Sequence, residues 1–401
     1  MSSNLAKHFL LREDVTFLNH GSFGACPRPV FETYQRFQLE LEGEPVDFLG
    51  RRLTELMKAP RVALGEFLGT SSENVVGVIN ATGGLNIVAQ SLDLKEGDEI
   101  VTTDHEYSAL EKTWAYVTRR TGAKVVVVNV PMPFVSEAAF TDALVAAFTD
   151  RTRVLFLSHI TSPTALVFPI ERPIAEARKR GIWTVIDGAH TPGHIPLDLD
   201  AMGVDFYSGN CHKWMMTPKG SAFLYARPEV QGLLNPLVIS HGWTIDSKQP
   251  DAKGAFGNSP FIDEIEMQGT RDPSAMLAIP SAIAFRKEHD WASVQRACTA
   301  LAQETALRLS ELTGLAPLSS PEFSAPQMVA MPIPECDPQE IHKQLWERYK
   351  IEIPVLKWKD HCIARLSVQG YNSKPQMDYL LEALTELLNL NAEPQLKRQH
   401  G

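Results

Sequence analysis

A lysine within an apolar and aromatic stretch is the first residue of the sequence that could do chemistry. Lys213 follows His212 and precedes Trp214, Met215 and Met216. Burial in such surroundings disfavours the charged form of a lysine, so its pKa falls and the neutral amine becomes available as a nucleophile. Such amines form Schiff bases with carbonyl compounds. The alternative is a surface lysine whose stem covers apolar neighbours, and other residues must decide between the two.

A carboxylate at the end of an apolar run is the second such residue. Asp187 follows Trp183, Thr184, Val185 and Ile186, a pattern that predicts a buried strand. A carboxylate buried without a partner is costly, and a protonated ring nitrogen would supply that partner. The pairing keeps a pyridinium charged, so that the ring can act as an electron sink. The alternative is that Asp187 caps the turn that follows it.

A glycine-containing loop between a strand and a helix is the third candidate. The loop Asn80–Gly84 contains Ala81, Thr82 and Gly83. Free backbone N–H groups, the helix dipole and the Thr82 hydroxyl favour a phosphate there, although a simple N-cap turn is the alternative. Neither the Walker nor the Rossmann pattern is present, which disfavours a nucleotide-binding enzyme. The lysine, the aspartate and this loop together predict pyridoxal 5'-phosphate, with the lysine as its Schiff-base residue.

These groups need a framework that brings them together. After residue 68, short apolar strands alternate with helices, the strands being expected at 74–79, 99–102, 124–130, 153–159, 183–187, 206–208 and 221–225. This alternation is typical of a mainly parallel sheet covered on both faces, in an α/β fold. Ligands of such sheets bind beyond the carboxyl ends of the strands. Polar clusters follow five of the strands, and we expect them to meet at one edge. The clusters begin at Asn80, His105, Ser158, Asp187 and Asn210.

The segment from residue 291 onward has a different pattern. We expect a long helix over 291–313, strands over 327–331, 351–355 and 362–368, and helices over 339–349 and 376–388. This order is typical of a smaller α+β domain. The sequence therefore predicts a large α/β domain over 15–275, a small domain formed by 1–14 and 276–390, and a flexible tail over 391–401.

Composition narrows the classes of function. The 401 residues are 44% hydrophobic and 21% charged, and their formal net charge is -10. This charge disfavours binding to nucleic acid or to an anionic membrane surface, and no apolar run is long enough to cross a bilayer. The five cysteines lack metal-type spacing, and residues 1–14 lack the apolar core of a signal peptide. We therefore expect a cytoplasmic protein that binds no metal.

Five segments of the chain resemble the class V aminotransferase family of pyridoxal-phosphate enzymes, and within it the isopenicillin N epimerase-like branch. The segments are Leu18–Gly24, Asn80–Gly83, Asp187–His190, Gly209–Trp214 and Gln268–Asp272. The resemblance implies a three-layer, aspartate-aminotransferase-like large domain of fold type I. It also implies a homodimer that acts at the α-carbon of an amino acid or an amino-acid derivative.

The resemblance assigns cofactor contacts to further positions. Tyr107 stands where family members stack a ring, usually histidine, on the cofactor face, and the nearby His105 is a weaker alternative. His190 stands where the phenolic oxygen of the cofactor is bound, often by glutamine. His212 resembles the phosphate ligand beside the lysine. Asn210 stands where many relatives place serine or threonine, which alters the expected phosphate contact.

Other matched positions concern the substrate and a second subunit. Arg365 matches the arginine that holds the substrate α-carboxylate with two hydrogen bonds; a salt-bridged strand arginine is the alternative. Thr270 resembles the residue that reaches the phosphate of the neighbouring subunit. Asn19 and His20 belong to a loop dense in hydrogen-bonding groups, which we expect to contact the substrate.

These assignments predict that Lys213 removes the α-proton of the substrate. Epimerisation follows if a proton returns from the other side, and a C–S lyase reaction follows if a β-substituent leaves. Transamination is the third outcome. Epimerisation needs a second acid, which the sequence does not identify; His20 is one candidate. A non-catalytic binding protein on the same fold is disfavoured because Lys213 and Asp187 are both present.

Overall fold

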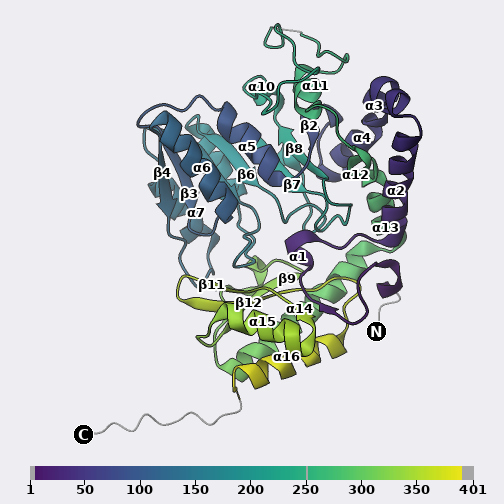
Figure 1. Cartoon of the computed structure of the whole chain (residues 1–401). Helices are drawn as coiled ribbons and strands as arrows, with labels where there is room; N and C mark the ends of the chain where they lie inside the picture. Colours follow the sequence, from purple (N-terminus) through teal and green to yellow (C-terminus); the bar gives the residue numbers. More distant parts are fainter. Residues whose placement is uncertain (1–4, 250–251, 391–401) are drawn as a thin grey trace.

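A seven-stranded sheet forms the centre of the larger part of the molecule (Figure 1). The computed structural model describes residues 5–249 and 252–390, so the expected flexible tail over 391–401 lies outside the described residues. The strand order is β2-β8-β7-β6-β5-β3-β4. The strands are β2 (Val75–Val78), β3 (Glu99–Thr103), β4 (Lys124–Val128), β5 (Thr152–Ser158), β6 (Trp183–Asp187), β7 (Phe206–Asn210) and β8 (Ala222–Ala226).

The strands of this sheet run mainly in parallel, as predicted. Strands β3 to β7 are parallel to one another, whereas β8 is antiparallel to both β7 and β2. Because β8 is antiparallel to both of its neighbours, β2 and β7 run in the same direction. The carboxyl ends of β2, β3, β5, β6 and β7 therefore lie at one edge, where the five polar clusters were expected to meet.

Alternation along the strands gives the sheet two apolar faces. In β5, Phe156 packs with α5 (Ala81–Ser91) and α6 (Ser108–Thr121) on one face. The next residue, Leu157, packs on the other face with α4 (Lys58–Leu68), α7 (Glu137–Ala146) and α8 (Glu171–Lys179). Because both faces are covered, the strands are continuously apolar. The result is the expected three-layer α/β arrangement.

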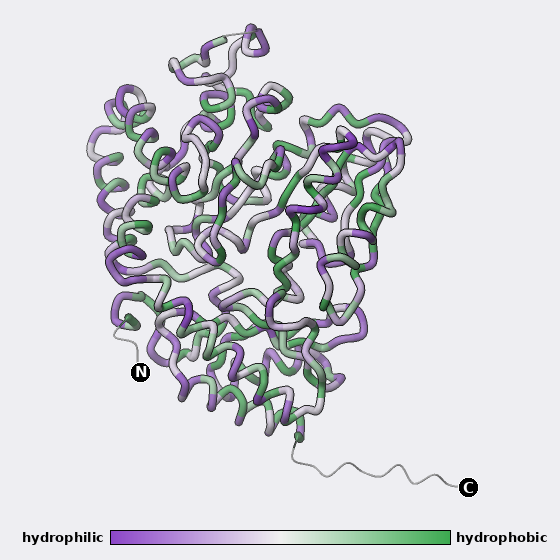
Figure 2. The backbone as a smooth tube through the Cα atoms, turned by 180° about the vertical axis from the view of Figure 1, so that it is seen from behind, coloured by the Kyte–Doolittle hydropathy of each residue, from purple (hydrophilic) through white to green (hydrophobic). Residues whose placement is uncertain are grey.

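A three-stranded antiparallel sheet forms the smaller part, in the order β11-β12-β9. Its strands are β9 (Met328–Ile333), β11 (Val355–Trp358) and β12 (His361–Ser367), and its helices are α14 (Trp291–Thr313), α15 (Pro338–Tyr349) and α16 (Lys374–Leu387). Hydrophilic and hydrophobic residues alternate within the turns of these helices (Figure 2), as expected when one helix face packs on a sheet.

Contacts between the two parts cross the domain limits proposed from the sequence. Strand β1 (Thr16–Phe17) pairs in parallel with β10 (Ile351–Glu352) of the smaller part. Helices α12 (Ser274–Leu277) and α13 (Ile279–Glu288) lie near or beyond the expected limit at residue 275, yet they pack against α2 (Arg28–Gly43) and α4. The limits at 15 and 275 remain a prediction.

The remaining elements are short. They are α1 (His20–Phe23), α3 (Leu53–Leu56), α9 (Leu199–Met202), α10 (Pro228–Gln231) and α11 (Pro260–Glu266), with a π-helix at Asp47–Arg52 and 3-10 turns at Ala6–His8, Ser72–Asn74 and Pro321–Phe323. None of the helices in the described ranges has the length and apolar character that a bilayer crossing requires.

Candidate active site

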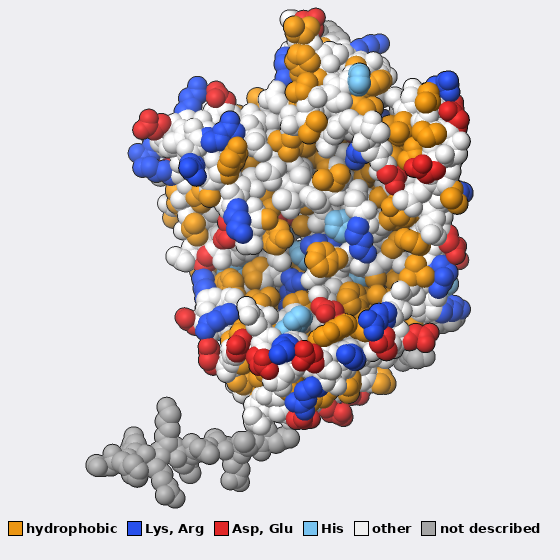
Figure 3. Space-filling model, viewed as in Figure 1, with side chains coloured by type: hydrophobic (Ala, Val, Ile, Leu, Met, Phe, Trp, Pro, Cys, Tyr) orange, Lys and Arg blue, Asp and Glu red, His pale blue; other side chains and the backbone are white. Residues whose placement is uncertain are grey.

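A cavity of about 460 Å³ lies at the edge of the sheet where the polar clusters meet. All five clusters contribute to its lining, through Asn80, Tyr107, Ser158, Asp187 and Asn210. Basic and histidine side chains gather at the centre of the molecule, between its larger and smaller parts (Figure 3). The prediction that one edge of the sheet collects these residues is therefore confirmed.

Lys213 lies in the loop after β7 and lines this cavity. Its Nζ is 3.1 Å from Nε2 of His190, and Trp214 and Met215 beside it are fully buried. Burial lowers the pKa of Lys213; the positive charge of Arg365 lowers it further, and the negative charge of Asp187 opposes the shift. The surface-lysine alternative is thus excluded, and the amine is disposed to be neutral.

Asp187 ends β6 and presents one unsatisfied oxygen to the cavity. The residue is 3% exposed, and its Oδ1 accepts a hydrogen bond from the backbone N–H of Ala189 at 2.8 Å. Its Oδ2 has no hydrogen-bond partner among the described residues. Burial raises the pKa of Asp187, and the Ala189 hydrogen bond and the charge of Lys213 oppose that effect. Such a carboxylate fits a protonated ring nitrogen of a ligand.

The amino end of α5 forms another wall of the cavity, and side chains already occupy two of its N–H groups. Oδ1 of Asn210 accepts from the N–H of Ala81 at 2.8 Å, and Oδ1 of Asn80 accepts from the N–H of Gly83 at 2.7 Å. The N–H and hydroxyl of Thr82 have no partner within the described ranges, and Thr82 lines the cavity. Of this loop, Thr82 is the residue best placed for a phosphate.

Arg365 reaches the cavity from β12 of the smaller sheet. Its Nη1 donates to the carbonyl and the hydroxyl of Ser162, at 2.5 and 3.1 Å, and its Nη2 donates to the hydroxyl of Ser22 at 3.1 Å. The side chain forms no ion pair with a carboxylate of the described residues, which excludes the salt-bridged alternative. Burial lowers the pKa of Arg365 to about 10, so it remains a cation. It can therefore bind an anionic group of a ligand.

Three histidines near the cavity differ in their surroundings. His190 lines the cavity, and its Nδ1 accepts from the indole N–H of Trp214 at 3.5 Å. His212 also lines it, with Nδ1 3.2 Å from the carbonyl oxygen of Ser221; burial lowers its pKa to about 4. His105, the weaker alternative for ring stacking, is fully buried against Trp358 and does not line the cavity.

Five residues expected at the site lie outside the lining of this cavity: Ala81 and Gly83 of the α5 loop, and Asn19, His20 and Thr270. Asn19 donates to Oε1 of Glu352 at 2.9 Å. The two ring nitrogens of His20 lie 3.0 Å from the hydroxyl of Tyr371 and from the carbonyl oxygen of Lys213. Burial lowers the pKa of His20 to about 3, which disfavours it as a second acid. Thr270 lines a separate cavity of about 530 Å³.

Some lining residues were not predicted from the sequence. Ser22 and Ser162 hold the guanidinium of Arg365, and Lys219 lines the cavity while donating to the carbonyl oxygen of Gly24 at 2.9 Å. Their common signal is a hydroxyl or amine beside glycine or proline in a loop that follows or precedes a strand. That signal is frequent in loops of every kind, so it identifies a site only after the fold is known.

Comparison with known proteins agrees with this geometry. The chain is 37% identical over 391 residues to an isopenicillin N epimerase of Amycolatopsis lactamdurans, covering 96% of this chain and 98% of that protein. It is 24% identical to a hercynylcysteine sulfoxide lyase of Schizosaccharomyces pombe, covering 96% and 97% of the two chains.

A solved structure of C-DES, a mutant with glycine covalently linked to its pyridoxal-phosphate cofactor, has a similar fold. The TM-score is 0.77 at 22% identity, over 93% of this chain and 97% of that one. The family model described as aminotransferase class-V matches residues 18–380. A buried lysine, an unpaired aspartate oxygen and the unpaired N–H of Thr82 thus meet at one cavity. The chain belongs to the class V aminotransferase family of pyridoxal-phosphate enzymes.

Proposed function

We propose that this enzyme epimerises an amino acid or an amino-acid derivative at its α-carbon. The observation that supports it most is the meeting of Lys213, Asp187 and Arg365 in one cavity. The similarity to an isopenicillin N epimerase over almost the whole of both chains favours epimerisation over the other reactions of the family. The similarity to a sulfoxide lyase supports β-elimination as the second candidate.

Each of these residues has a proposed task. Arg365 holds the α-carboxylate of the substrate through its two terminal nitrogens, and the neutral amine of Lys213 removes the α-proton. Asp187 keeps a proton on the ring nitrogen of the cofactor. When bound, pyridoxal phosphate accepts the electron pair that the lost proton leaves behind. His190 is proposed for the phenolic oxygen, and Thr82, His212 and Asn210 for the phosphate end, where Asn210 acts by holding Ala81.

A proton-exchange experiment tests this function. The purified protein, supplied with pyridoxal phosphate, is incubated with a panel of amino acids in deuterated water and followed by NMR. Deuterium at the α-carbon together with loss of optical purity supports epimerisation. Pyruvate or another elimination product supports the lyase, and a keto acid supports transamination. If no amino acid of the panel reacts, the proposal is wrong.

Replacement of Lys213 by alanine provides the accompanying spectroscopic test. We expect the wild type to show a visible absorption band with pyridoxal phosphate and the Lys213→Ala variant to lose it, because the covalent link requires this amine. Lys179→Ala is the control, since this lysine is exposed on α8. An unchanged band in Lys213→Ala would contradict the assignment.

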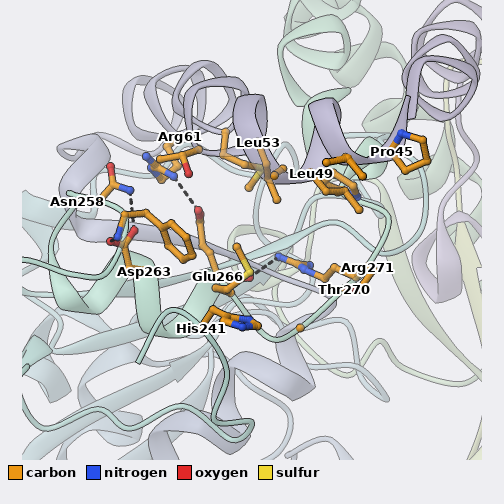
Figure 4. A pocket seen from close by; sticks show the side chains of 18 residues that line it. Pro45, Leu49, Leu53, Arg61, His241, Asn258, Asp263, Glu266, Thr270 and Arg271 are labelled. Atoms are coloured by element: carbon orange, nitrogen blue, oxygen red, sulfur yellow. Dashed lines mark hydrogen bonds and ion pairs between the residues drawn. The ribbon is translucent and has the colours of Figure 1, made fainter. Parts of the chain in front are cut away.

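We also propose a homodimer in which Thr270 completes the site of the neighbouring subunit. Thr270 lies at a second cavity that opens between α3, the π-helix before it and the loop from α11 to α12 (Figure 4). Leu49, Leu53 and Pro45 form an apolar wall there, facing Arg271 and Glu266. Nearby Val46 is 65% exposed. An exposed apolar wall beside a residue expected to serve another subunit supports this interface.

The proposed location is the cytoplasm. All five cysteines are free thiols in the structure, which agrees with a reducing compartment.

A further inference from the structure

We propose that Tyr107 is the second acid of the epimerisation and delivers a proton to the α-carbon from the side opposite Lys213. This inference rests on the proposed function. Inversion at carbon requires one group that removes the proton and another that returns a proton to the opposite side. His20, the candidate for this role from the sequence, does not line the cavity, and neither does the nearby His105.

The order of the strands places Tyr107 and Lys213 at opposite ends of a row. Lys213 follows β7, Asp187 ends β6, Ser162 lies in the loop after β5, and Tyr107 follows β3. The sheet order is β7-β6-β5-β3, so three strand spacings, about 14 Å, separate the ends that carry the two side chains. The backbone positions of the lysine and the tyrosine therefore lie on opposite sides of the cavity that both residues line.

Arg365 is bound to the loop after β5, a strand that lies between those preceding Lys213 and Tyr107. Its guanidinium is fixed on Ser162, in the loop after β5, and on Ser22. Its charge contributes to the lowered pKa of Lys213, and the phenol of Tyr107 in turn opposes the effect of burial on the pKa of Arg365. Both groups thus lie within electrostatic range of the residue proposed to hold the substrate. A carboxylate on Arg365 would place the α-carbon between them.

Tyr107 also has a free hydroxyl, as does Thr82 at the proposed phosphate end, whereas three other donors of the lining are engaged. The hydroxyl of Ser22 donates to Asn19 and the amine of Lys219 to Gly24. The hydroxyl of Ser158 donates to Glu106. The hydroxyl of Tyr107 makes no hydrogen bond to any described residue, and the side chain is 44% exposed at the mouth of the cavity. It is available to a substrate and to water.

The proton transfers balance without another reactant. The Nζ of Lys213 takes the α-proton and becomes an ammonium group. The electron pair of the broken C–H bond forms a new C–H bond with the phenolic proton of Tyr107, and the phenolate remains near the positive charge of Arg365. Because the mouth of the cavity is open to water, a proton released by Lys213 can return to Tyr107 through solvent.

Replacement of Tyr107 by phenylalanine separates removal of the α-proton by Lys213 from return of a proton to the opposite side. The variant keeps the ring and loses the hydroxyl, so the α-proton should still exchange with deuterated water while the original configuration is retained. Inversion should fall by roughly 10²- to 10⁴-fold, the usual effect of losing a general acid. Tyr116→Phe is the matched control, because Tyr116 lies on α6, is 53% exposed and does not line the cavity.

Binding provides a readout that does not depend on turnover. An α-methyl analogue of the substrate found in the amino-acid panel has no α-proton, so its dissociation constant reports binding alone. We expect the same constant, and the same visible band, for Tyr107→Phe and the wild type.

Each other outcome contradicts the inference. If Tyr107→Phe inverts its substrate at the wild-type rate, the hydroxyl donates no proton. If exchange and inversion fall together, Tyr107 acts on binding or on Lys213. If the wild type exchanges no α-proton, the proposed function itself is wrong, a result recognisable without any variant.

Discussion

Glu106 is a buried carboxyl directly behind the cavity lining. It is 6% exposed and accepts hydrogen bonds from the Thr103 hydroxyl at 2.7 Å and from the N–H and hydroxyl of Ser158 at 2.8 and 2.6 Å. Burial raises its pKa to about 8; these hydrogen bonds oppose the shift, and the charge of Asp187 adds to it. With two carboxyl groups so close, we expect Glu106 to hold its proton at neutral pH while Asp187 serves the cofactor.

Replacing Glu106 by glutamine should make the protein more resistant to alkaline conditions. The pKa of Glu106 in the folded protein, about 8, lies above that of an unfolded glutamate, about 4.3. Between these two pKa values the folded state holds one proton more than the unfolded state. The free energy of unfolding of the wild type therefore falls as the pH rises through this range. Relative to wild type, Glu106→Gln should gain up to about 1.4 kcal/mol of unfolding free energy per pH unit, levelling off above pH 8.

Urea unfolding of both proteins, at about pH 5, 6.5, 8 and 9, measures this difference. Every other titrating group is common to the two chains, so the slope of the difference belongs to Glu106. A difference that does not change with pH would show that Glu106 is ionised in the folded protein.

A tight contact between two loops fixes the backbone at Lys213. Gly24 closes α1 with φ 71 and ψ 163, a conformation that almost only glycine adopts. A Cβ at this position would lie 1.9 Å from the carbonyl oxygen of His212 and 3.0 Å from Cα of Lys213. The loop after β1 is therefore in direct contact with the loop that carries Lys213.

Gly24→Ala should destabilise the protein and weaken the visible band. The backbone strain alone costs about 1–3 kcal/mol, and relief of the clash must displace His212 and Lys213. Gly43→Ala is the control: a Cβ there has no neighbour within 4 Å, so we expect an unchanged or slightly higher melting temperature. Thermal unfolding followed by circular dichroism, with an absorption spectrum of each variant, tests this prediction. Equal melting temperatures for the two variants would contradict it.

Elements with a strong local pattern were predicted well from the sequence. Trp183–Asp187 is a strand and Trp291–Thr313 a helix with the expected limits, because continuous apolar runs and long amphipathic periods identify them locally. Strand direction depends on partners distant in the chain, so the reversal of β8 had no local signal. The helices α10 and α12 were missed because four residues are too few to show a period.

In the site too, features with a local sequence pattern were predicted, and features that depend on distant parts of the chain were not. Lys213 and Thr82 follow strands and Asp187 ends one, and the topology brings the three residues to one cavity as expected. The clasp of Ser22 and Ser162 on Arg365 joins segments about 140 to 340 positions apart, which no local pattern reveals. Asn19 is hydrogen-bonded to Ser22 and Glu352, and His20 to Tyr371, Gln369 and the backbone of Lys213. Their expected contact with the substrate stays a prediction.

Mixed dimers should show whether two subunits share each site. In a dimer of one Lys213→Ala and one Thr270→Ala subunit, the intact Lys213 of one chain meets the intact Thr270 of the other if the site is shared. Mixing the two variants under conditions that exchange subunits should then give more activity than the average of the separate variants. An activity equal to that average would mean that Thr270 serves its own chain. Leu307 is an exposed residue of α14 and does not line the second cavity. Figure 1 shows α14 in the smaller part and α3 and α11 in the larger one, so we expect Leu307→Asp to leave the dimer unchanged.

The pairing of β2 with the antiparallel strand β8 affects when β2 can form its hydrogen bonds during synthesis. β2 is the first strand of the large sheet to leave the ribosome, but its hydrogen-bonding partner in that sheet is β8, the last. At about 5–20 residues per second, roughly 7 to 30 s pass between the two. During that time Val75–Val78, whose residues are all buried in the finished protein, cannot make its native pairing. In the nascent chain, this apolar strand therefore stays without its native partner until the segment that carries Lys213 has been synthesised.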